Sequence, residues 1–531
     1  MKRTALLMAS TLAGAAALLA QQTGPPAVPF QIEEATIASI HGAMKSGQLT
    51  CRGLVEQYLR RIEAYDKNGP AINALVEMNP RALEQAGELD RRFKSEGPTG
   101  ALHCIPAIVK DNFETVGLQS AAGSLALKGF VSAKDAFQVR KIKEAGAIAL
   151  AKSNMAEWAF TPYETVSSIL PGYTKNPYAL DRVTAGSSGG TAAAVAANLG
   201  AIGLGSDTGN SIRGPSSHQA LVGIRSTMGL TSRAGVVPLN LLADIAGPMT
   251  RSVADAVAVF QVIAGPDPDD PITVGGTPAA GRFGPAGRPT AIPDYARALV
   301  RNGLAGARLG VLRQAYERES TDPEIVQVFT TALEDMKHAG ATIVDPARVD
   351  LAGIRRAQGS GPCGGFKYDI NRYLAGHGDR IPVKSLDDII RSRRFHPSVH
   401  RRLEQSQEGQ ENGPDSPGCA AEAEYRQRVR AAVLTLMDAE KLDALVYPTW
   451  SNPPRLIGDL NTPHGDNSQF FSPTTGFPSI NVPMGYTRGV LPAGITFFGR
   501  AWDEPTLIKL AFAYEQATRQ RRPPASAGPL R

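Results

Sequence analysis

Short apolar segments alternate with helical segments along the first half of this chain, and this alternation constrains the fold more than any other feature. Apolar runs occupy residues 101–109, 147–151 and 201–205, and helical patterns occupy residues 138–145 and 185–198. Short apolar runs separated by helices are typical of buried strands in α/β proteins. The sequence therefore predicts an α/β fold with a central mixed β-sheet covered by helices on both faces.

The chain of 531 residues shows no clear division into domains. Residues 32–65 have a helical pattern with Thr50 as an expected N-cap. Two segments resemble loops: residues 265–293 are dense in Gly, Pro and Asp, and residues 406–423 are polar. Neither separates a second apolar region, so we interpret both as surface excursions from a single large domain over residues 31–525.

Residues 1–20 differ in composition from the rest of the chain. Lys2 and Arg3 precede an uncharged stretch rich in Ala and Leu. A charged start, a short apolar stretch and a small residue at its end are typical of a secretory signal peptide. A retained membrane anchor is the main alternative, but the stretch is short for a bilayer span and no cysteine follows it to carry a lipid. We expect cleavage after Ala20, a linker over residues 21–30, export to the periplasm or medium, and no stable membrane insertion of the mature protein.

Charge and cysteine content exclude several other classes of function. Lys and Arg exceed Asp and Glu by six, but the excess is spread along the chain, so we expect a solvated surface and no nucleic-acid partner. The cysteines form no C-x-x-C motif, so the sequence shows no zinc-binding or redox motif. Disulfides and buried thiols are both compatible with their spacing. The four are Cys51, Cys104, Cys363 and Cys419.

Two clusters of Ser and Gly lie within residues 185–215. Glycine lets backbone amides converge on a ligand, but a phosphate-binding loop needs a Gly-Lys-Ser/Thr ending, which this segment lacks. Residues 186–190 match the G-x-S-x-G nucleophile elbow of α/β-hydrolases, with Ser188 as nucleophile. That motif requires a preceding strand and a late acid and histidine. Residues 177–184 suggest a loop instead, and His464 is the one late histidine candidate, so an esterase using Ser188 stays open as an alternative.

Several segments, taken in order, resemble the amidase signature family of serine hydrolases. The likeness is strongest in residues 185–215 and recurs at residues 105–112, 151–157, 175–178, 247–255, 447–449 and 476–483. Each segment is short, but their shared order extends over most of the mature chain. The resemblance implies the amidase signature fold and hydrolysis of a primary or small secondary carboxamide to a carboxylic acid and ammonia or amine (EC 3.5.1), without metal or organic cofactor.

The resemblance also assigns a Ser–Ser–Lys triad. Ser211 matches the nucleophile, Ser187 matches the bridging serine that the family holds by a cis peptide, and Lys110 matches the base. A serine hydroxyl is a weak nucleophile that needs a neighbouring base. Lysine can act as that base when burial lowers its pKa from about 10.4 towards neutrality. Ser187 would then relay a proton between Ser211 and Lys110.

An oxyanion hole is implied by the same resemblance. Backbone N–H groups around Thr208, Gly209, Asn210 and Ser211 would bind the developing oxyanion. The structural supports of the turn would be Ser188, Asp207 and Arg213. The family usually has glycine where this chain has Asn210. Asparagine is among the few residues tolerated at positive φ, so we expect the turn to survive. The side chain of Asn210 could narrow the pocket or contact the substrate.

Other functions remain compatible with the sequence. The A-subunit glutaminase of a tRNA-dependent amidotransferase shares the same signature, although its complex is cytoplasmic and this chain begins like an exported protein. A catalytically inactive binding protein is a further alternative, against which the intact Lys110, Ser187 and Ser211 argue.

The partner that the sequence predicts is a small-molecule amide, whose identity the sequence does not give. Trp158, Tyr163, Phe470 and Phe471 are candidates for the substrate-binding wall, but packing in the core is favoured by roughly two to one. The sequence leaves the oligomeric state undetermined, and a homodimer stays open.

Overall fold

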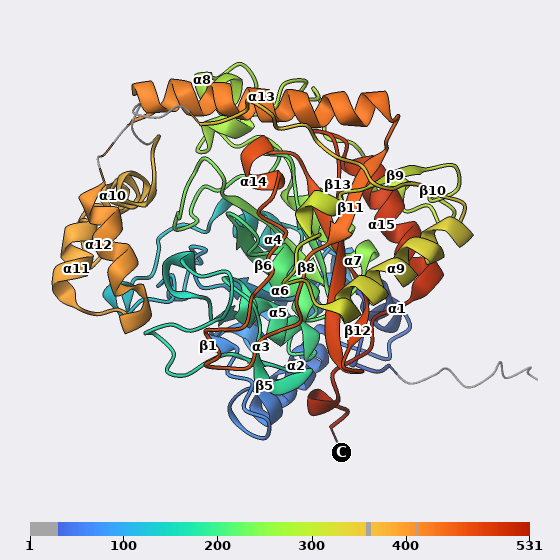
Figure 1. The fold of residues 1–531 in the computed structure, drawn as a ribbon. Helices are drawn as coiled ribbons and strands as arrows, with labels where there is room; N and C mark the ends of the chain where they lie inside the picture. Colours follow the sequence, from blue (N-terminus) through green and yellow to red (C-terminus); the bar gives the residue numbers. More distant parts are fainter. Residues whose placement is uncertain (1–29, 357–362, 410, 412, 531) are drawn as a thin grey trace, which may run out of the picture.

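A mixed β-sheet of eleven strands forms the centre of the computed structural model, which describes residues 30–356, 363–409, 411 and 413–530 (Figure 1). The described strands are β1 (Leu75–Met78), β2 (Pro106–Lys110), β3 (Ile148–Ser153), β4 (Lys175–Asn176), β5 (Ala179–Val183), β6 (Ile202–Asp207), β7 (Val222–Arg225), β8 (Ile245–Thr250), β9 (Arg308–Val311), β10 (Thr342–Val344), β11 (Ala444–Pro448), β12 (Ser479–Thr487) and β13 (Leu491–Phe498).

Strand order in the large sheet is β1-β3-β2-β6-β8-β7-β12-β13-β11-β9-β10, and β4 and β5 form a separate two-stranded sheet. β2 is parallel to both β3 and β6, and β9 is parallel to both β10 and β11. The other pairings in the large sheet are antiparallel. The predicted single large α/β domain with a central mixed sheet is therefore confirmed.

Helices pack on both faces of this sheet. The described α-helices are α1 (Ile37–Lys45), α2 (Cys51–Ile62), α3 (Ala82–Glu96), α4 (Phe137–Glu144), α5 (Gly189–Ala196), α6 (Arg213–His218), α7 (Val253–Ile263), α8 (Pro278–Phe283), α9 (Pro323–His338), α10 (Phe366–His377), α11 (Leu386–Ser392), α12 (His400–Glu408), α13 (Pro417–Ala439), α14 (Ser472–Thr475) and α15 (Glu504–Thr518). α5 packs on β2 and β6, α6 packs on β7, β12 and β13, and the two helices also contact each other. A second layer contains α4, α7, α15 and α9, each in contact with the next. Strands β2, β3 and β6 are buried along their whole length, which explains their apolar sequences.

A helical lobe made of α10, α11 and α12 (residues 366–408) gathers at one side of the molecule, and the long α13 runs across the top (Figure 1). Side chains of the lobe share a small buried cluster with Trp158 and Phe160 of the main body. The predicted helix with Thr50 as N-cap is confirmed, since the Thr50 side chain accepts a hydrogen bond from Gly53 N at the start of α2.

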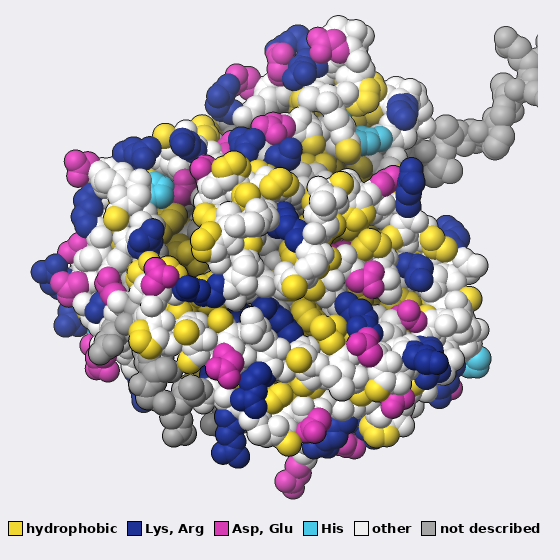
Figure 2. All heavy atoms as spheres, turned by 90° about the horizontal axis from the view of Figure 1, so that it is seen from above, with side chains coloured by type: hydrophobic (Ala, Val, Ile, Leu, Met, Phe, Trp, Pro, Cys, Tyr) yellow, Lys and Arg dark blue, Asp and Glu magenta, His cyan; other side chains and the backbone are white. Residues whose placement is uncertain are grey.

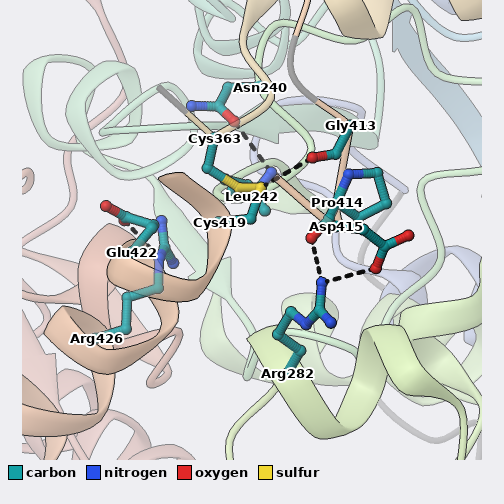
Figure 3. The surroundings of a disulfide bond; sticks show 10 residues. All are labelled: Asn240, Leu242, Arg282, Cys363, Gly413, Pro414, Asp415, Cys419, Glu422 and Arg426. Carbon is teal, nitrogen blue, oxygen red and sulfur yellow. Dashed lines mark hydrogen bonds and ion pairs between the residues drawn. A yellow bond between two sulfur atoms is a disulfide. The ribbon is translucent and has the colours of Figure 1, made fainter. Parts of the chain in front are cut away.

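The four cysteines form two disulfides, whereas their spacing in the sequence was compatible with disulfides and with buried thiols. Cys51 at the start of α2 is bonded to Cys104, just before β2. Cys363 is bonded to Cys419, so it joins the segment that enters the helical lobe to the segment that leaves it (Figure 3). Arg282 of α8 lies beside this junction and pairs with Asp415 at 3.2 Å (Figure 3).

The segment expected to be a surface excursion at residues 265–293 is bound more closely to the body than the sequence suggested. Ile272 and Phe283 are buried in a small cluster with Met228. Asp270 forms an ion pair with Arg233 at 2.6 Å, and both side chains are almost fully buried. A run rich in Gly and Pro has no regular apolar pattern, so these buried side chains could not be recognised from the sequence.

Residues 406–423, expected to be a loop, are partly helical. α12 continues to Glu408 and α13 begins at Pro417, so the connection between helices is shorter than predicted. The predicted signal peptide and most of the predicted linker (residues 1–29) lie outside the described residues.

None of the helices in the described ranges is both long and apolar enough to cross a bilayer. On the face shown in Figure 2, basic and acidic side chains lie interspersed, without a broad area of one sign. This mixture agrees with the expectation of a solvated surface.

Candidate active site

The carboxyl ends of β2 and β6 meet at one edge of the sheet. The two strands are adjacent and parallel, with Val109 opposite Leu204. Lys110 is the last residue of β2 and Asp207 is the last residue of β6. Parallel neighbours end at the same edge, so the two turns that carry the predicted site residues leave the sheet side by side.

Lys110 is fully buried at this edge and points its amine at two serines. Its Nζ lies 2.8 Å from Ser187 Oγ, 2.9 Å from Ser206 Oγ and 3.3 Å from Ser206 O. Asn112 Nδ2 also donates to Ser206 Oγ, at 3.0 Å. The structure therefore brings together two of the three residues of the predicted triad through a direct hydrogen bond.

Burial lowers the pKa of Lys110 from 10.5 to about 7, and the negative charges of Asp207 and Asp244 oppose this effect without cancelling it. Near neutral pH, a large fraction of the amine is then uncharged. An uncharged amine has two N–H donors and one lone pair. Ser206 can accept both donors through its carbonyl and hydroxyl oxygens, which leaves the lone pair for the hydroxyl proton of Ser187.

Ser187 follows a cis peptide bond with Gly186, as the resemblance implied. Glycine is required before it on steric grounds. A Cβ at Gly186 would lie only 2.7 Å from Thr161 O, and closer still to Glu164 O. Both contacts are with backbone atoms, which cannot turn away as a side chain can. The tight turn thus fixes Ser187 next to Lys110.

Asp207 organises the turn that leads to Ser211. Its Oδ2 accepts hydrogen bonds from Ile212 N at 3.0 Å and from Arg213 Nε at 3.1 Å, and its Oδ1 pairs with Arg225 at 2.9 Å. Burial alone would raise the pKa of Asp207, but Arg213 and Arg225 hold it well below its usual value. The carboxylate is therefore charged throughout the physiological range and holds the turn in shape.

Ser211 lines a cavity of about 230 Å³ together with Thr208, Gly209 and Asn210. Ser211 is 5% exposed, and its Oγ lies 3.4 Å from Asn210 Oδ1. All the residues assigned to the oxyanion hole are thus gathered around one cavity with Ser211. An added Cβ at Gly209 would lie 2.9 Å from Gln469 Oε1, so a side chain at this position would require Gln469 to move.

The expected reason for tolerating Asn210 is wrong. Asn210 does not adopt a positive φ, so the turn needs no left-handed residue at this position. Its side chain turns towards Gly214, where an added Cβ would lie 2.6 Å from Asn210 Nδ2. The absence of a side chain at Gly214 therefore makes room for asparagine at position 210.

The alternative nucleophile, Ser188, has a different environment. It is fully buried, and its Oγ donates to Ser206 O at 3.2 Å. Contrary to the predicted loop, β5 does precede it, but β5 belongs to the two-stranded sheet and not to the central one. His464 stacks on Tyr163 with ring centroids 4.0 Å apart, and its Nδ1 accepts from Asp466 N. The elbow arrangement therefore lacks the central strand that defines it.

The four aromatic candidates for the substrate-binding wall do not line the cavity around Ser211. Trp158 and Phe471 are each 1% exposed and belong to buried clusters, whereas Phe470 is 37% exposed. The fourth, Tyr163, stacks on a histidine ring as described above. The cavity is instead completed by Ala159, Phe160, Pro162, Leu239, Ala243, Arg402, Gln469 and Pro473.

Sequence reasoning missed three polar residues that build the site. Ser206 holds Lys110, and Arg225 pairs with Asp207 from a later strand. Asp244 accepts the hydroxyl of Thr208 and the backbone N–H groups of Leu239 and Asn240. Ser206 immediately precedes the turn that leads to Ser211, so its position in the sequence could have indicated a role in the site. No local pattern indicated the other two.

Comparison with known proteins identifies the family. The Amidase family model matches residues 53–508. The chain belongs to the amidase family. Among its relatives, a probable amidase of Arabidopsis thaliana is 35% identical over 518 residues, which cover 93% of this chain and 92% of the relative. The A subunit of the glutamyl-tRNA(Gln) amidotransferase of Myxococcus xanthus is 33% identical over 504 residues, which cover 92% of this chain and 98% of that protein.

Solved structures of other amidases resemble this one. The native peptide amidase of Stenotrophomonas maltophilia superposes with a TM-score of 0.82 at 36% identity, over 94% of this chain and 100% of that chain. A peptide amidase in complex with the competitive inhibitor chymostatin superposes with a TM-score of 0.79 at 36% identity, over 93% and 100% of the two chains. This amidase is thus a hydrolase of amide C–N bonds with the fold that the resemblance implied.

Proposed function

We propose that this amidase hydrolyses a primary or small secondary carboxamide through an acyl-enzyme on Ser211, with Ser187 as proton relay and Lys110 as base. One observation carries the proposal: a fully buried lysine, whose pKa burial lowers to about 7, contacts Ser187 at the same sheet edge as the Ser211 cavity. A buried amine with a lowered pKa beside serine hydroxyls is the arrangement that a lysine base requires.

In the first half of the reaction, Ser211 Oγ attacks the amide carbonyl carbon and passes its proton to Ser187, while Ser187 passes its own proton to Lys110. Backbone N–H groups of the turn at Thr208, Gly209 and Asn210 stabilise the oxyanion. The proton then returns from Lys110 through Ser187 to the departing nitrogen, and the C–N bond breaks. In the second half, water attacks the ester carbon along the same proton path and releases the carboxylic acid and Ser211.

The likeness to peptide amidases favours a peptidyl acyl group. Phe160, Leu239 and Pro473 give the cavity apolar walls next to the serine, as a small hydrophobic or peptidyl group requires. The likeness to amidotransferase subunits favours a glutaminase as the second candidate. A glutaminase would release ammonia from glutamine, whereas a peptide amidase would release it from peptide amides.

Export to the periplasm or medium is also part of the proposal. The charged and then apolar composition of residues 1–20 motivates it. The two disulfides, Cys51–Cys104 and Cys363–Cys419, support it, because disulfides persist in oxidising compartments and are rare in the cytosol.

Labelling by a fluorophosphonate probe, followed by mass spectrometry of the labelled peptide, tests the assignment of the nucleophile. The label is expected on Ser211, and Ser211→Ala should abolish it. Ser187→Ala should slow labelling severely without removing the attachment site. Ser188→Ala serves as the matched control, because it removes a neighbouring hydroxyl but leaves the attachment site. A label on Ser188, or full labelling of Ser211→Ala, would overturn the proposed mechanism.

A further inference from the structure

The side chain of Asn210 contacts the serine that the proposed mechanism uses as nucleophile. Asn210 is 1% exposed and lines the cavity around Ser211. Its Oδ1 is the acceptor for the Ser211 hydroxyl, at 3.4 Å. In the part of the chain that the structure describes, no hydrogen bond joins Ser211 Oγ to Ser187 or Lys110. The hydroxyl proton is therefore directed at Asn210, whereas the proton relay requires it to be directed at Ser187.

This contact between Ser211 and Asn210 is weak. The two oxygens of a strong O–H···O hydrogen bond lie about 2.7–2.8 Å apart. The distance of 3.4 Å between Ser211 Oγ and Asn210 Oδ1 is much longer. The hydroxyl can therefore turn from Asn210 to Ser187 at little cost, but an acceptor at this distance holds the nucleophilic oxygen only loosely.

The other end of the same carboxamide is unpaired. Asn210 Nδ2 is buried and has no hydrogen-bond acceptor among the described residues. It lies against Gly214, where an added Cβ would be 2.6 Å from Nδ2 and 3.1 Å from Trp450 Cζ2. A buried N–H donor without an acceptor is rare, because it has lost its water without a replacement. This donor therefore indicates that the side chain does more than fill space.

A half turn of the carboxamide pairs this donor with the nucleophile. The backbone is fixed at this point, since Gly214 N donates to Asn210 O at 2.7 Å. The terminal torsion of asparagine is roughly two-fold, and its amide oxygen and nitrogen are of similar size. A half turn thus exchanges Oδ1 and Nδ2 within the same space. Nδ2 then donates to Ser211 Oγ, whose own proton becomes free for Ser187.

We propose that Asn210 is a further catalytic residue, whose Nδ2 donates a hydrogen bond to Ser211 Oγ during the reaction. The inference rests on the proposed acyl-enzyme at Ser211. The donor holds Oγ while its proton passes to Ser187, and it stabilises the negative charge that Oγ gains as this proton leaves. The same charge develops in the second half of the reaction, when the ester C–Oγ bond breaks and Ser187 returns a proton to Oγ. Asn210 itself neither gains nor loses a proton.

Two variants of the full-length protein remove the donor: Asn210→Ala and Asn210→Gly, the latter with the residue that the family usually has. For ammonia release from acetyl-dialanine amide, we expect kcat to fall about 10- to 100-fold, somewhat less than for loss of an oxyanion-hole donor. KM should stay within about twofold, because the hydrogen bond gains strength only in the transition state. Fluorophosphonate labelling of Ser211 should slow by a similar factor. Each rate is divided by the amount of Ser211 that is finally labelled, so that misfolded protein does not contribute.

The isosteric variant Asn210→Asp separates a donor from a space-filling side chain. Its carboxyl group can donate a hydrogen bond only while it is protonated. Since Lys110 must be neutral at the same time, kcat/KM of this variant should pass through a maximum with pH, whereas wild-type activity levels off above pH 7. Asn461→Asp is the matched control, because Asn461 is exposed and does not line the cavity. It should keep the wild-type profile.

Two results would overturn this inference alone: a kcat within about twofold of wild type in Asn210→Ala and Asn210→Gly, or activity of Asn210→Asp that stays level at alkaline pH. In both cases Ser211 would still be labelled by the fluorophosphonate. If the two smaller side chains prevent folding, the pH profile of Asn210→Asp decides. Loss of labelling at Ser211 in the wild type would instead refute the proposed function, and the inference with it.

Discussion

Replacing Lys110 by methionine should abolish amide hydrolysis and yet stabilise the protein near neutral pH. In the unfolded chain this lysine takes up a proton below its ordinary pKa of 10.5, whereas burial lowers its pKa to about 7 in the folded state. The unfolded state therefore binds more protons than the folded state between these two values. Wild-type stability falls as the pH falls from 10.5 to 7, and the loss is complete below about 7.

The magnitude follows from the two pKa values. One pKa unit corresponds to about 1.4 kcal/mol, so the penalty is roughly 4 kcal/mol at pH 7 and roughly 1 kcal/mol at pH 10. Methionine also removes three hydrogen bonds of Nζ, each of which contributes about 1 kcal/mol to the stability of the wild type. Their partners are Ser187 Oγ, Ser206 Oγ and Ser206 O. We expect Lys110→Met to be more stable than wild type by about 1 kcal/mol at pH 7 and less stable by about 2 kcal/mol at pH 10.

Denaturant unfolding of both proteins at pH 7 and pH 10 measures this effect. The free energy of unfolding of the variant minus that of the wild type is determined at each pH. The change in this value from pH 7 to pH 10 cancels the contribution of every other titrating group. It should amount to roughly 3 kcal/mol. A difference that does not change with pH would refute the reasoning, and so would a relative gain of the variant at pH 10.

A second buried lysine gives the matched control. Lys152 on β3 is also fully buried, and burial lowers its pKa to about 8. Its Nζ contacts Phe113 O and Ser120 Oγ instead of the serines at the active-site edge. Lys152→Met should show a pH-dependent stability change of the same sign over the narrower range from 10.5 to 8, and should retain the labelling of Ser211.

Three further predictions concern activity, stability and processing. Because the neutral amine of Lys110 is the active form, kcat/KM should rise about tenfold per pH unit below pH 7 and level off above it. Lys110→Arg should be inactive at every pH between 5 and 9, because a guanidinium does not lose its proton in this range. Activity in that variant would contradict the assignment of Lys110 as the base. Arg213→Leu leaves Asp207 with Arg225 alone and should destabilise the protein by about 3–5 kcal/mol, seen as a lower denaturation midpoint; an unchanged midpoint would show that the pair is not structural. Protein recovered from the periplasm or medium should begin near Gln21 on N-terminal sequencing, and an intact Met1 in the cytoplasm would defeat the export proposal.

Local sequence patterns predicted the central parts of the fold. The apolar runs before Lys110 and before Ser206 became β2 and β6, because strands buried on both faces must be apolar throughout. The Ser- and Gly-rich turns could be placed at one site because they resemble a family in which they meet. The contact of Lys110 with Ser187 spans 77 residues of sequence and has no periodic signal of its own.

Contacts between distant segments account for what the sequence did not predict. Arg402 reaches the cavity from a helix more than 190 positions after Ser211, and its own neighbourhood on α12 is that of any solvated helix. The anchoring of residues 265–293 rests on single side chains such as Asp270, whose partner lies 37 positions earlier. β5 was mistaken for a loop because a short strand in a two-stranded sheet is half-exposed and lacks an apolar sequence.

The disulfide between Cys363 and Cys419 also changes what proteolysis does to this molecule. The two cysteines are 56 positions apart in the sequence, and their bond closes the chain between them into a covalent ring. This ring includes the helical lobe and Arg402. A protease that cuts once anywhere within this ring leaves both fragments attached to each other. The nicked protein runs as one species on a non-reducing gel and separates into two only after reduction. Nicking can thus occur without release of the lobe from the body that carries Ser211.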